Sequence, residues 1–266
     1  MSFAPRLIVF DSGMGGLTVA RAIRAHLPAV QMLYVVDNGG FPYGALSDKV
    51  LIARVAATID AALDEIGRCD AIVIACNTAS TTVLEHLRAR HNLPIVGVVP
   101  AVKWAASISL TRQIGVLATA ATAHRPYLAD LIARFAGDCR VHIHGAARLA
   151  EYAERDFCGE PVDDEVIAAE VAPLFAHADA PPIDKIALGC THYPLLLPQL
   201  TRLFPGREFL DPADAVAKRV VAVALTPNEG WGGKVPANRT LLTARPARPI
   251  DRLADEGLEF HGIMKI

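Results

Sequence analysis

Two kinds of segment alternate along nearly the whole chain. Short runs rich in β-branched and other apolar residues, such as 7–10 and 71–75, are followed by longer stretches in which apolar residues recur at helical spacing, as in 50–66. This alternation of strand and helix patterns is typical of βα units, whose helices cover a mostly parallel sheet. The sequence therefore predicts an α/β fold.

The same patterns give the expected elements. The expected strands are 7–10, 32–36, 71–75, 95–98, 114–117, 140–143, 183–188 and 240–243. The expected helices are 17–26, 47–67, 80–90, 101–109, 127–137, 163–177, 194–203 and 213–225. A stretch rich in Gly and Pro, 227–236, predicts a surface loop.

A weak internal repeat divides the chain into two similar halves. The string at 72–78, IVIACNT, resembles IALGCTH at 186–192, because each has an apolar run, a small residue, a cysteine and two polar residues. Earlier in each half, 7–13 resembles 114–119. The repeat predicts two similar domains with mostly parallel sheets, related by a pseudo-two-fold axis, with an active site in the cleft between them.

Composition excludes several classes of protein. Hydrophobic residues make up 52% and charged residues 20% of the chain, which is typical of a globular protein. The net charge is -2 and no basic stripe is present, so we expect no nucleic-acid partner. Apolar runs are shorter than the roughly 20 residues that cross a bilayer, and the N-terminus lacks a signal-peptide pattern. We expect no membrane partner and a cytoplasmic protein whose 5 scattered cysteines are free thiols.

Two of the cysteines are candidates for acid–base chemistry. Cys76 and Cys190 each follow a predicted strand and precede two polar residues and a predicted helix. Open α/β sheets bind ligands at the carboxyl ends of their strands, and a helix N-terminus favours a thiolate. A free cysteine is more often a buried apolar residue, and we give Cys69, Cys139 and Cys158 that interpretation.

Two thiols on opposite faces of one carbon can invert its configuration. One thiol, as thiolate, removes the α-proton, and the other delivers a proton from the far side. Asp11 and His192 are candidate assistants of Cys76 and Cys190, because a carboxylate or an imidazole can orient the proton of a nearby thiol. An aspartate after a strand is also a common turn or cap residue, so both interpretations of Asp11 stay open.

Two turns carry possible ligand contacts. The glycine-rich string at 11–16, DSGMGG, has neither the spacing of a dinucleotide site nor the lysine of a P-loop, so it predicts binding of an anion such as a substrate carboxylate. The string at 41–44, FPYG, is either a simple turn or a segment whose backbone amides hold a second carboxylate.

At these residues the chain resembles the glutamate racemases, within the aspartate/glutamate racemase superfamily. The matching motifs are 11–16, 37–38 with 41–44, 76–80, 97–101, 189–196 and, last in the same order, 211–213. The motif around Cys190 is the most specific. The resemblance implies an isomerase that interconverts L- and D-glutamate for peptidoglycan without pyridoxal phosphate, other cofactors or metal, often as a homodimer.

The resemblance also implies roles for single residues. Cys76 and Cys190 would be the two acid–base residues, and Asp11 and His192 would assist them and contact the substrate. The other substrate-binding residues would be Ser12, Tyr43, Gly44, Asn77, Thr78 and Thr191. Glu151 and Thr119 fall in regions that also line the cleft of the family. The implied first domain spans 1–97 plus 208–266, and the second spans 98–207.

Some features depart from the family, and three alternatives stay open. The string at 144–147, HGAA, lacks a common Cys-Pro, and the match is loose from Lys234 onward. Because the chain begins without the N-terminal extension of members activated by a cell-wall precursor, we expect no such activator. The alternatives are a racemase for aspartate or another amino acid, a non-catalytic two-lobed protein that binds a dicarboxylate, and a zinc site of Cys76, Cys190 and His192. Those three ligands lack the spacing of structural zinc sites.

Overall fold

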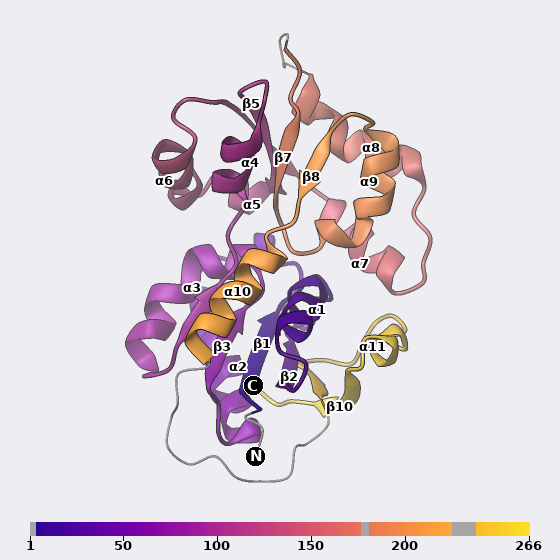
Figure 1. The fold of residues 1–266 in the computed structure, drawn as a ribbon. Helices are drawn as coiled ribbons and strands as arrows, with labels where there is room; N and C mark the ends of the chain where they lie inside the picture. Colours follow the sequence, from indigo (N-terminus) through magenta and orange to yellow (C-terminus); the bar gives the residue numbers. More distant parts are fainter. Residues whose placement is uncertain (1–3, 177–180, 225–237) are drawn as a thin grey trace. The chain divides into compact units, whose positions relative to one another are not determined.

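The computed structural model describes residues 4–176, 181–224 and 238–266, which form two compact units. The first unit comprises Met1–Val98 and Ala213–Ile266, and the second is Val99–Pro212. Each contains a sheet of parallel strands with helices packed on it (Figure 1), so the predicted α/β class is confirmed. The loop predicted at 227–236 lies outside the described residues.

Six described strands form the sheet of the first unit. They are β1 (Arg6–Asp11), β2 (Gln31–Val36), β3 (Ala71–Ile74), β4 (Ile95–Gly97), β9 (Arg239–Leu242) and β10 (Glu259–Ile263). Their order across the sheet is β10-β9-β2-β1-β3-β4, and every neighbouring pair is parallel. In the register, Phe10 lies opposite Ile74 and Asp11 opposite Val36, so the carboxyl ends of the three central strands meet at one edge.

Helices cover both faces of this sheet. They are α1 (Leu17–His26), the 3-10 turn η1 (Tyr43–Ala45), α2 (Asp48–Ile66), α3 (Asn77–Arg90), α10 (Ala213–Ala224) and α11 (Arg252–Asp255). α1 packs beside α10 and α2 beside α3. The β1–α1–β2 connection and the β2–α2–β3 connection run in opposite directions across the sheet, so right-handed crossovers place α1 and α2 on opposite faces. The core between the sheet and the α2–α3 pair is built from β-branched and aliphatic side chains, among them Ile8, Val55 and Ile72.

The second unit has a smaller parallel sheet. Its strands are β5 (Gln113–Thr119), β6 (Arg140–Ala146), β7 (Lys185–Gly189) and β8 (Glu208–Leu210), in the order β6-β5-β7-β8. Its helices are α4 (Val102–Ile108), α5 (Ala120–Ala123), α6 (Pro126–Phe135), α7 (Leu149–Phe157), α8 (Asp164–Val171), α9 (Leu197–Leu203) and the 3-10 turns η2 (Ala172–Phe175) and η3 (Tyr193–Leu196). Two apolar clusters pack on this sheet, one with α4 and α6 and one with α7, α8 and α9.

The strand order supports the internal repeat. The first four strands of each unit have the same spatial order, in which the second strand along the chain lies beside the first, followed by the third and the fourth. This order is β2-β1-β3-β4 in the first unit and β6-β5-β7-β8 in the second. β1 therefore corresponds to β5, and β3 to β7. Cys76 and Cys190 follow these corresponding strands, at the positions that the repeated sequence assigned to them.

Several elements differ from the sequence prediction. The chain leaves the second unit at Pro212 rather than near 207, because β8 pairs with β7 and completes the second sheet. The helix expected at 163–177 ends as α8 at Val171, and η2, with Pro173 in its first turn, follows it. The helix expected at 80–90 begins three residues earlier, at Asn77, immediately after Cys76.

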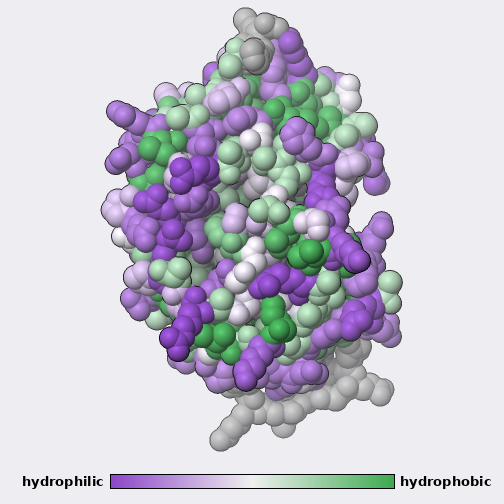
Figure 2. Space-filling model, turned by 180° about the vertical axis from the view of Figure 1, so that it is seen from behind, coloured by the Kyte–Doolittle hydropathy of each residue, from purple (hydrophilic) through white to green (hydrophobic). Residues whose placement is uncertain are grey.

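The exposed apolar side chains are dispersed. The large ones include Val50, Trp104, Ile143 and Phe260, which belong to different elements, and Leu110, which lies between α4 and β5. On the face shown in Figure 2, apolar groups form small patches among hydrophilic ones. Single exposed apolar residues are normal in soluble domains and indicate no particular partner. Within the described residues, no helix has the length and apolar character that crossing a membrane requires.

Candidate active site

The thiol of Cys76 lies at the carboxyl end of β3, where helix α3 begins. Cys76 has extended backbone angles, is 5% exposed and occupies the N-cap position of this helix. Its carbonyl accepts the backbone N–H of Ser80 at 2.8 Å, and the Ser80 hydroxyl donates to Ile74 O at 2.9 Å. These bonds fix the backbone around the thiol.

Asp11 and Ser12 reach this thiol from the end of β1. The Ser12 hydroxyl lies 3.7 Å from Cys76 Sγ and 3.3 Å from Asp11 Oδ1, which links the carboxylate to the thiol through Ser12. Asp11 Oδ1 also accepts the Ser12 N–H at 2.6 Å, and Oδ2 accepts the Gly16 N–H at 2.5 Å. Asp11 is therefore both the turn cap and a neighbour of the thiol site. The two amides that it engages belong to the turn predicted to bind an anion.

The predicted ligand residues Asn77 and Thr78 follow the thiol in the first turn of α3. Asn77 is 2% exposed, and neither its Oδ1 nor its Nδ2 has a hydrogen-bond partner among the described residues. A buried amide without a partner costs roughly 1–3 kcal/mol, and such groups are rare in native structures. Asn77 is therefore a strong candidate for contact with a polar ligand.

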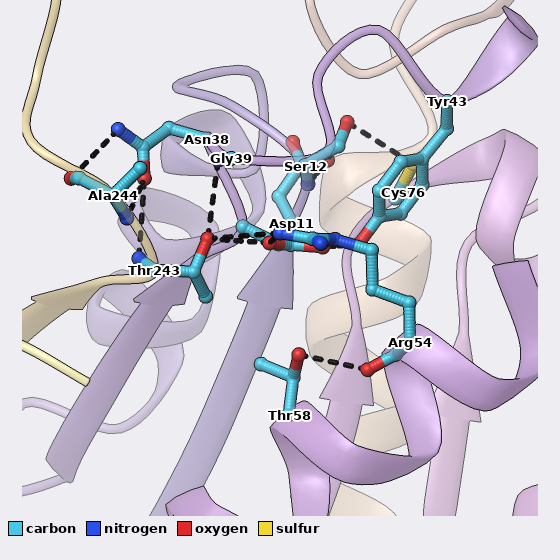
Figure 3. A network of polar contacts seen from close by, with 11 residues as sticks. Asp11, Ser12, Asn38, Gly39, Tyr43, Arg54, Thr58, Cys76, Thr243 and Ala244 are labelled. Carbon is cyan, nitrogen blue, oxygen red and sulfur yellow. Dashed lines mark hydrogen bonds and ion pairs between the residues drawn. The ribbon is translucent and has the colours of Figure 1, made fainter. Parts of the chain in front are cut away.

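Tyr43 and Gly44 begin the 3-10 turn η1, which packs against α3. The Tyr43 hydroxyl donates to Asp37 Oδ2 at 2.5 Å. Burial, then the charge of Asp37 and this hydrogen bond, and then the charges of Cys76 and Asp11 raise the pKa of Tyr43 well above its usual range. Tyr43 is therefore a neutral hydrogen-bond donor near Cys76. We call Asp11, Ser12, Tyr43, Cys76 and Asn77 the Cys76 site, and Figure 3 shows the first four of these residues.

The second thiol has a different set of partners, at the end of β7. Cys190 is 7% exposed, and its Sγ lies 3.9 Å from His192 Nδ1. His192 Nε2 lies 3.0 Å from Glu154 Oε2 on helix α7, and both side chains are buried. Thr191 is buried between the cysteine and the histidine in the chain. These residues form the Cys190 site, in which a carboxylate can orient the imidazole that faces the thiol.

Glu154 was not predicted from the sequence. The resemblance had pointed to Glu151, which lies one turn earlier in α7 and pairs with Arg148 at 3.0 Å. Thr119, the other residue of that group, caps α5 by accepting the Thr122 N–H at 3.2 Å. The sequence contains one signal for a buried residue in this helix, the amphipathic pattern over 149–157. Leu149, Ala153 and Phe157 share one face and are buried, and Glu154 is buried with them.

The remaining cysteines lie outside both sites. Cys69 is buried, and this burial raises its pKa to about 12. Cys158 is buried at the end of α7, and Cys139 is partly exposed. Among the residues that the structure describes, no group of three or more His, Cys, Asp or Glu side chains could hold a metal ion.

Comparisons with known proteins place the chain in a family. The model of the Asp/Glu/Hydantoin racemase family matches residues 17–220. The chain belongs to this racemase family. Among the curated relatives, the glutamate racemase of Granulibacter bethesdensis is 52% identical over 221 residues, which cover 83% of this chain and 79% of the relative. The glutamate racemase of Proteus mirabilis is 43% identical over 232 residues, covering 86% and 80%.

Solved structures of racemases have the same fold. The structure of Escherichia coli glutamate racemase in complex with L-glutamate and the activator UDP-MurNAc-Ala has a TM-score of 0.92, 35% identity and 99% coverage of both chains. That of Thermus thermophilus glutamate racemase with β-chloro-D-alanine has a TM-score of 0.72 and 28% identity, and covers 99% of this chain and 96% of the other. The resemblance drawn from the motifs is confirmed, and this racemase is an isomerase.

The comparison with the E. coli racemase removes the basis of one expectation. We expected no activator because the chain begins without an N-terminal extension. The solved E. coli chain, whose structure contains an activator, is nevertheless matched over 99% of its length. The absence of an activator is therefore not supported by this comparison.

Proposed function

We propose that this racemase interconverts L- and D-glutamate by proton transfer between Cys76 and Cys190, without a cofactor. The observation that carries the proposal is the correspondence between the two thiols. Each follows the equivalent strand of a repeated fold, and each has its own polar partners, Asp11 with Ser12 for Cys76 and Glu154 with His192 for Cys190.

In the proposed reaction, one cysteine is a thiolate and the other a thiol when substrate binds. The thiolate takes the α-proton, and the carbanion that forms takes a proton on its opposite face from the other thiol. The stereocentre inverts and the two cysteines exchange protonation states, so the reverse reaction uses the same groups in exchanged roles. This scheme requires both thiols to reach one α-carbon.

The polar residues next to the thiols have separate roles in this proposal. The Ser12 hydroxyl links the Asp11 carboxylate to the Cys76 thiol by hydrogen bonds. His192, oriented by Glu154, exchanges a proton with Cys190. The Asn77 amide, together with Thr78 and Thr191, binds polar groups of the substrate. The backbone of Tyr43–Gly44 binds a carboxylate.

The test combines racemisation with exchange in deuterated water. The wild type converts either enantiomer of glutamate to the racemate and incorporates deuterium at the α-carbon. Cys76→Ala and Cys190→Ala abolish racemisation and still bind glutamate. Any α-hydrogen exchange that remains is confined to one enantiomer, and to opposite enantiomers in the two variants, because each retains a base on only one face. Racemisation without deuterium uptake would contradict the two-base scheme.

Substrate turnover and metal analysis separate the alternatives. Turnover of L-aspartate without turnover of L-glutamate would assign a different substrate. Binding of glutamate without turnover of either enantiomer would favour a binding protein. Stoichiometric zinc in protein purified without chelators would favour the metal site. Supply of D-glutamate for peptidoglycan, a homodimer and a cytoplasmic location remain predictions, which growth rescue by D-glutamate in a deletion strain, light scattering and cell fractionation would test.

A second candidate activity is response to a phosphate-bearing activator. A pocket of about 200 Å³ in the first unit lies at the edge strand β4 between Arg88 and Arg219. Arg88 Nη2 donates to Ile95 O at 3.2 Å, and neither guanidinium has an ion-pair partner among the described residues. Two such guanidinium groups favour an anion. The activator in the E. coli structure, a nucleoside diphosphate derivative, has this chemistry.

This candidate replaces the expectation that no activator binds. UDP-MurNAc-Ala should raise the glutamate turnover of the wild type, and Arg88→Ala with Arg219→Ala should remove the increase and leave basal turnover unchanged. Equal turnover with and without the compound would contradict it.

A further inference from the structure

A buried carboxylate beside the Cys76 site holds four hydrogen-bond donors. Asp37 follows β2 and is 0% exposed. Its Oδ2 accepts from the Tyr43 hydroxyl at 2.5 Å and from Arg54 Nε at 2.6 Å. Its Oδ1 accepts from Arg54 Nη2 at 2.6 Å and from the Thr243 hydroxyl. We call Asp37, Tyr43, Arg54 and Thr243 the Asp37 network; Figure 3 labels Tyr43, Arg54 and Thr243.

Arg54 supplies the positive charge that faces this carboxylate. It reaches Asp37 from α2 with two nitrogen atoms in a bidentate pair, the strongest geometry for such a contact. A buried carboxylate without a paired charge would be strongly destabilising. Glycines in the loop after Asp37 leave room for the guanidinium. A Cβ on Gly40 would lie 2.5 Å from Arg54 Nε, and a Cβ on Gly39 would lie 2.8 Å from Arg54 Nη2.

On one side the Asp37 network reaches η1, the turn proposed to bind a substrate carboxylate. Tyr43 begins η1, its ring lies 6.3 Å from that of Phe10, and η1 packs against α3 just after Cys76. The hydroxyl of Tyr43 is committed to Asp37 and is not free to rotate toward another acceptor. The position of the Tyr43–Gly44 backbone is therefore set by a carboxylate that itself lies outside the substrate contacts.

On the other side the network is joined to the C-terminal segment. Thr243 follows β9, donates its hydroxyl to Asp37 and accepts the Gly39 N–H at 3.1 Å. Asn38 Oδ1 accepts the backbone N–H groups of Thr243 at 3.1 Å and of Ala244 at 3.0 Å. Asn38 Nδ2 donates to Ala244 O at 3.0 Å. The loop before Tyr43 is thus hydrogen-bonded to residues about 200 positions later in the chain.

We propose that Asp37 and Arg54 are positioning residues for the substrate, and that Thr243 makes the C-terminal segment part of the substrate site. The pair and Thr243 hold the 38–44 loop so that the Tyr43–Gly44 backbone meets a carboxylate of glutamate. This inference rests on the proposed function for its substrate. It assigns a role to the C-terminal segment, where the family motifs are weakest.

The chemistry of a carboxylate predicts that replacing Asp37 by its amide disrupts the Asp37 network. An ionised carboxylate accepts about four hydrogen bonds, whereas a side-chain amide oxygen accepts about two and its nitrogen donates. Asp37→Asn therefore leaves two of the four donors facing a group that cannot accept from them, and Arg54 loses its counter-charge. Thr243→Val removes one donor and keeps the shape of the side chain.

The experiment measures substrate binding and loop mobility in the same variants. Arg54→Lys keeps the charge and loses the bidentate contact. It should raise the KM for both enantiomers of glutamate by about tenfold and change kcat by less than about threefold, because the loop binds the substrate and does not transfer the proton. Thr243→Val should raise KM by about threefold. Amide hydrogen exchange over 38–45 should be faster in both variants.

Arg90→Lys is the matched control, because Arg90 makes the same bidentate contact with Asp60 on the surface of the first unit. Its KM and its exchange over 38–45 should equal those of the wild type. An Arg54→Lys variant that behaves like Arg90→Lys would overturn the proposal. If Arg54→Lys does not fold, unchanged KM and exchange in Thr243→Val would overturn it.

The wild type separates the two proposals. A wild type that does not turn over glutamate refutes the proposed function, and with it the glutamate-positioning role. A wild type that does turn over glutamate, together with a normal KM in Arg54→Lys and Thr243→Val, refutes the positioning role alone. Faster exchange over 38–45 with higher KM supports it.

Discussion

Glu154→Gln tests whether the buried Glu154–His192 pair contributes to proton transfer at Cys190. The side chains are nearly isosteric, and the Nε2–Oε2 distance is 3.0 Å in a buried setting. A hydrogen bond to a charged group contributes roughly 1.5–3 kcal/mol and a neutral one roughly 0.5–1.5 kcal/mol, so losing the charge costs about 1.5 kcal/mol. Because 1.36 kcal/mol corresponds to tenfold in rate, kcat/KM for glutamate should fall by about tenfold.

The assay follows racemisation from each enantiomer by circular dichroism or chiral chromatography. Enantiomers have equal free energies, so the equilibrium constant fixes kcat/KM to be equal in both directions. Glu154→Gln must therefore lower kcat/KM equally for L- and D-glutamate, and this equality is an internal control of the measurement. Unequal effects on kcat are allowed, because the two directions use Cys190 as base and as acid.

Glu151→Gln is the informative comparison in the same helix. Glu151 pairs with Arg148 at a partly exposed position, and exposed ion pairs contribute about 0–1 kcal/mol. We expect kcat/KM of this variant to stay within about twofold of the wild type. Equal losses in the two variants, or a Glu154→Gln variant with wild-type kcat/KM, would refute the assigned role of Glu154.

Three further outcomes follow from the described contacts. Gly40→Ala, whose Cβ would lie 2.5 Å from Arg54 Nε, should raise the KM for glutamate several-fold and lower Tm, and wild-type kinetics would contradict this. Since the pKa of Cys69 is about 12, about one molecule in ten thousand carries its thiolate at pH 8, so mass spectrometry should find Cys69 unalkylated by iodoacetamide until the protein unfolds. Partial burial raises the pKa of Asp184, but hydrogen bonds from Ser109, Leu110 and Thr111 outweigh it and lower the pKa. The stability that Asp184 contributes is therefore present above its unfolded pKa of about 4 and lost as the pH falls, so Asp184→Asn should lower Tm at pH 7 and less at pH 3.

The thiol positions could be predicted from the sequence because they depend on strong local patterns. Continuous apolar runs before Cys76 and Cys190 mark buried parallel strands, and the polar residues after them mark the strand ends where such folds bind ligands. The structure places both cysteines there. The two expected assistants also lie near their cysteines, since each is close in sequence to a strand end. Asp11 is linked to Cys76 through Ser12, and His192 lies beside Cys190.

The partners that come from distant elements could not be predicted in this way. Glu154 contacts His192 of the Cys190 site, and Arg54 and Thr243 contact Asp37 beside the Cys76 site. These contacts arise from tertiary packing, and the helical pattern over 149–157 indicates only that this part of α7 has a buried face, not which residue Glu154 contacts. β8 (Glu208–Leu210) and β10 (Glu259–Ile263) were missed because one is three residues long and the other is an edge strand whose residues are mostly exposed. Neither has the alternation or the apolar run that identifies a strand.

The interrupted first unit has a consequence for biosynthesis. β9 lies beside β2, but its residues leave the ribosome only after the whole second unit has been translated. The uninterrupted second unit can thus complete its sheet on the nascent chain. Until β9 is translated, residues 6–98 have one edge of β2 unpaired, and Asp37 lacks its hydrogen bond from Thr243. Stalled chains ending before 238 should be protease-resistant across 99–212 and cleaved readily in 6–98.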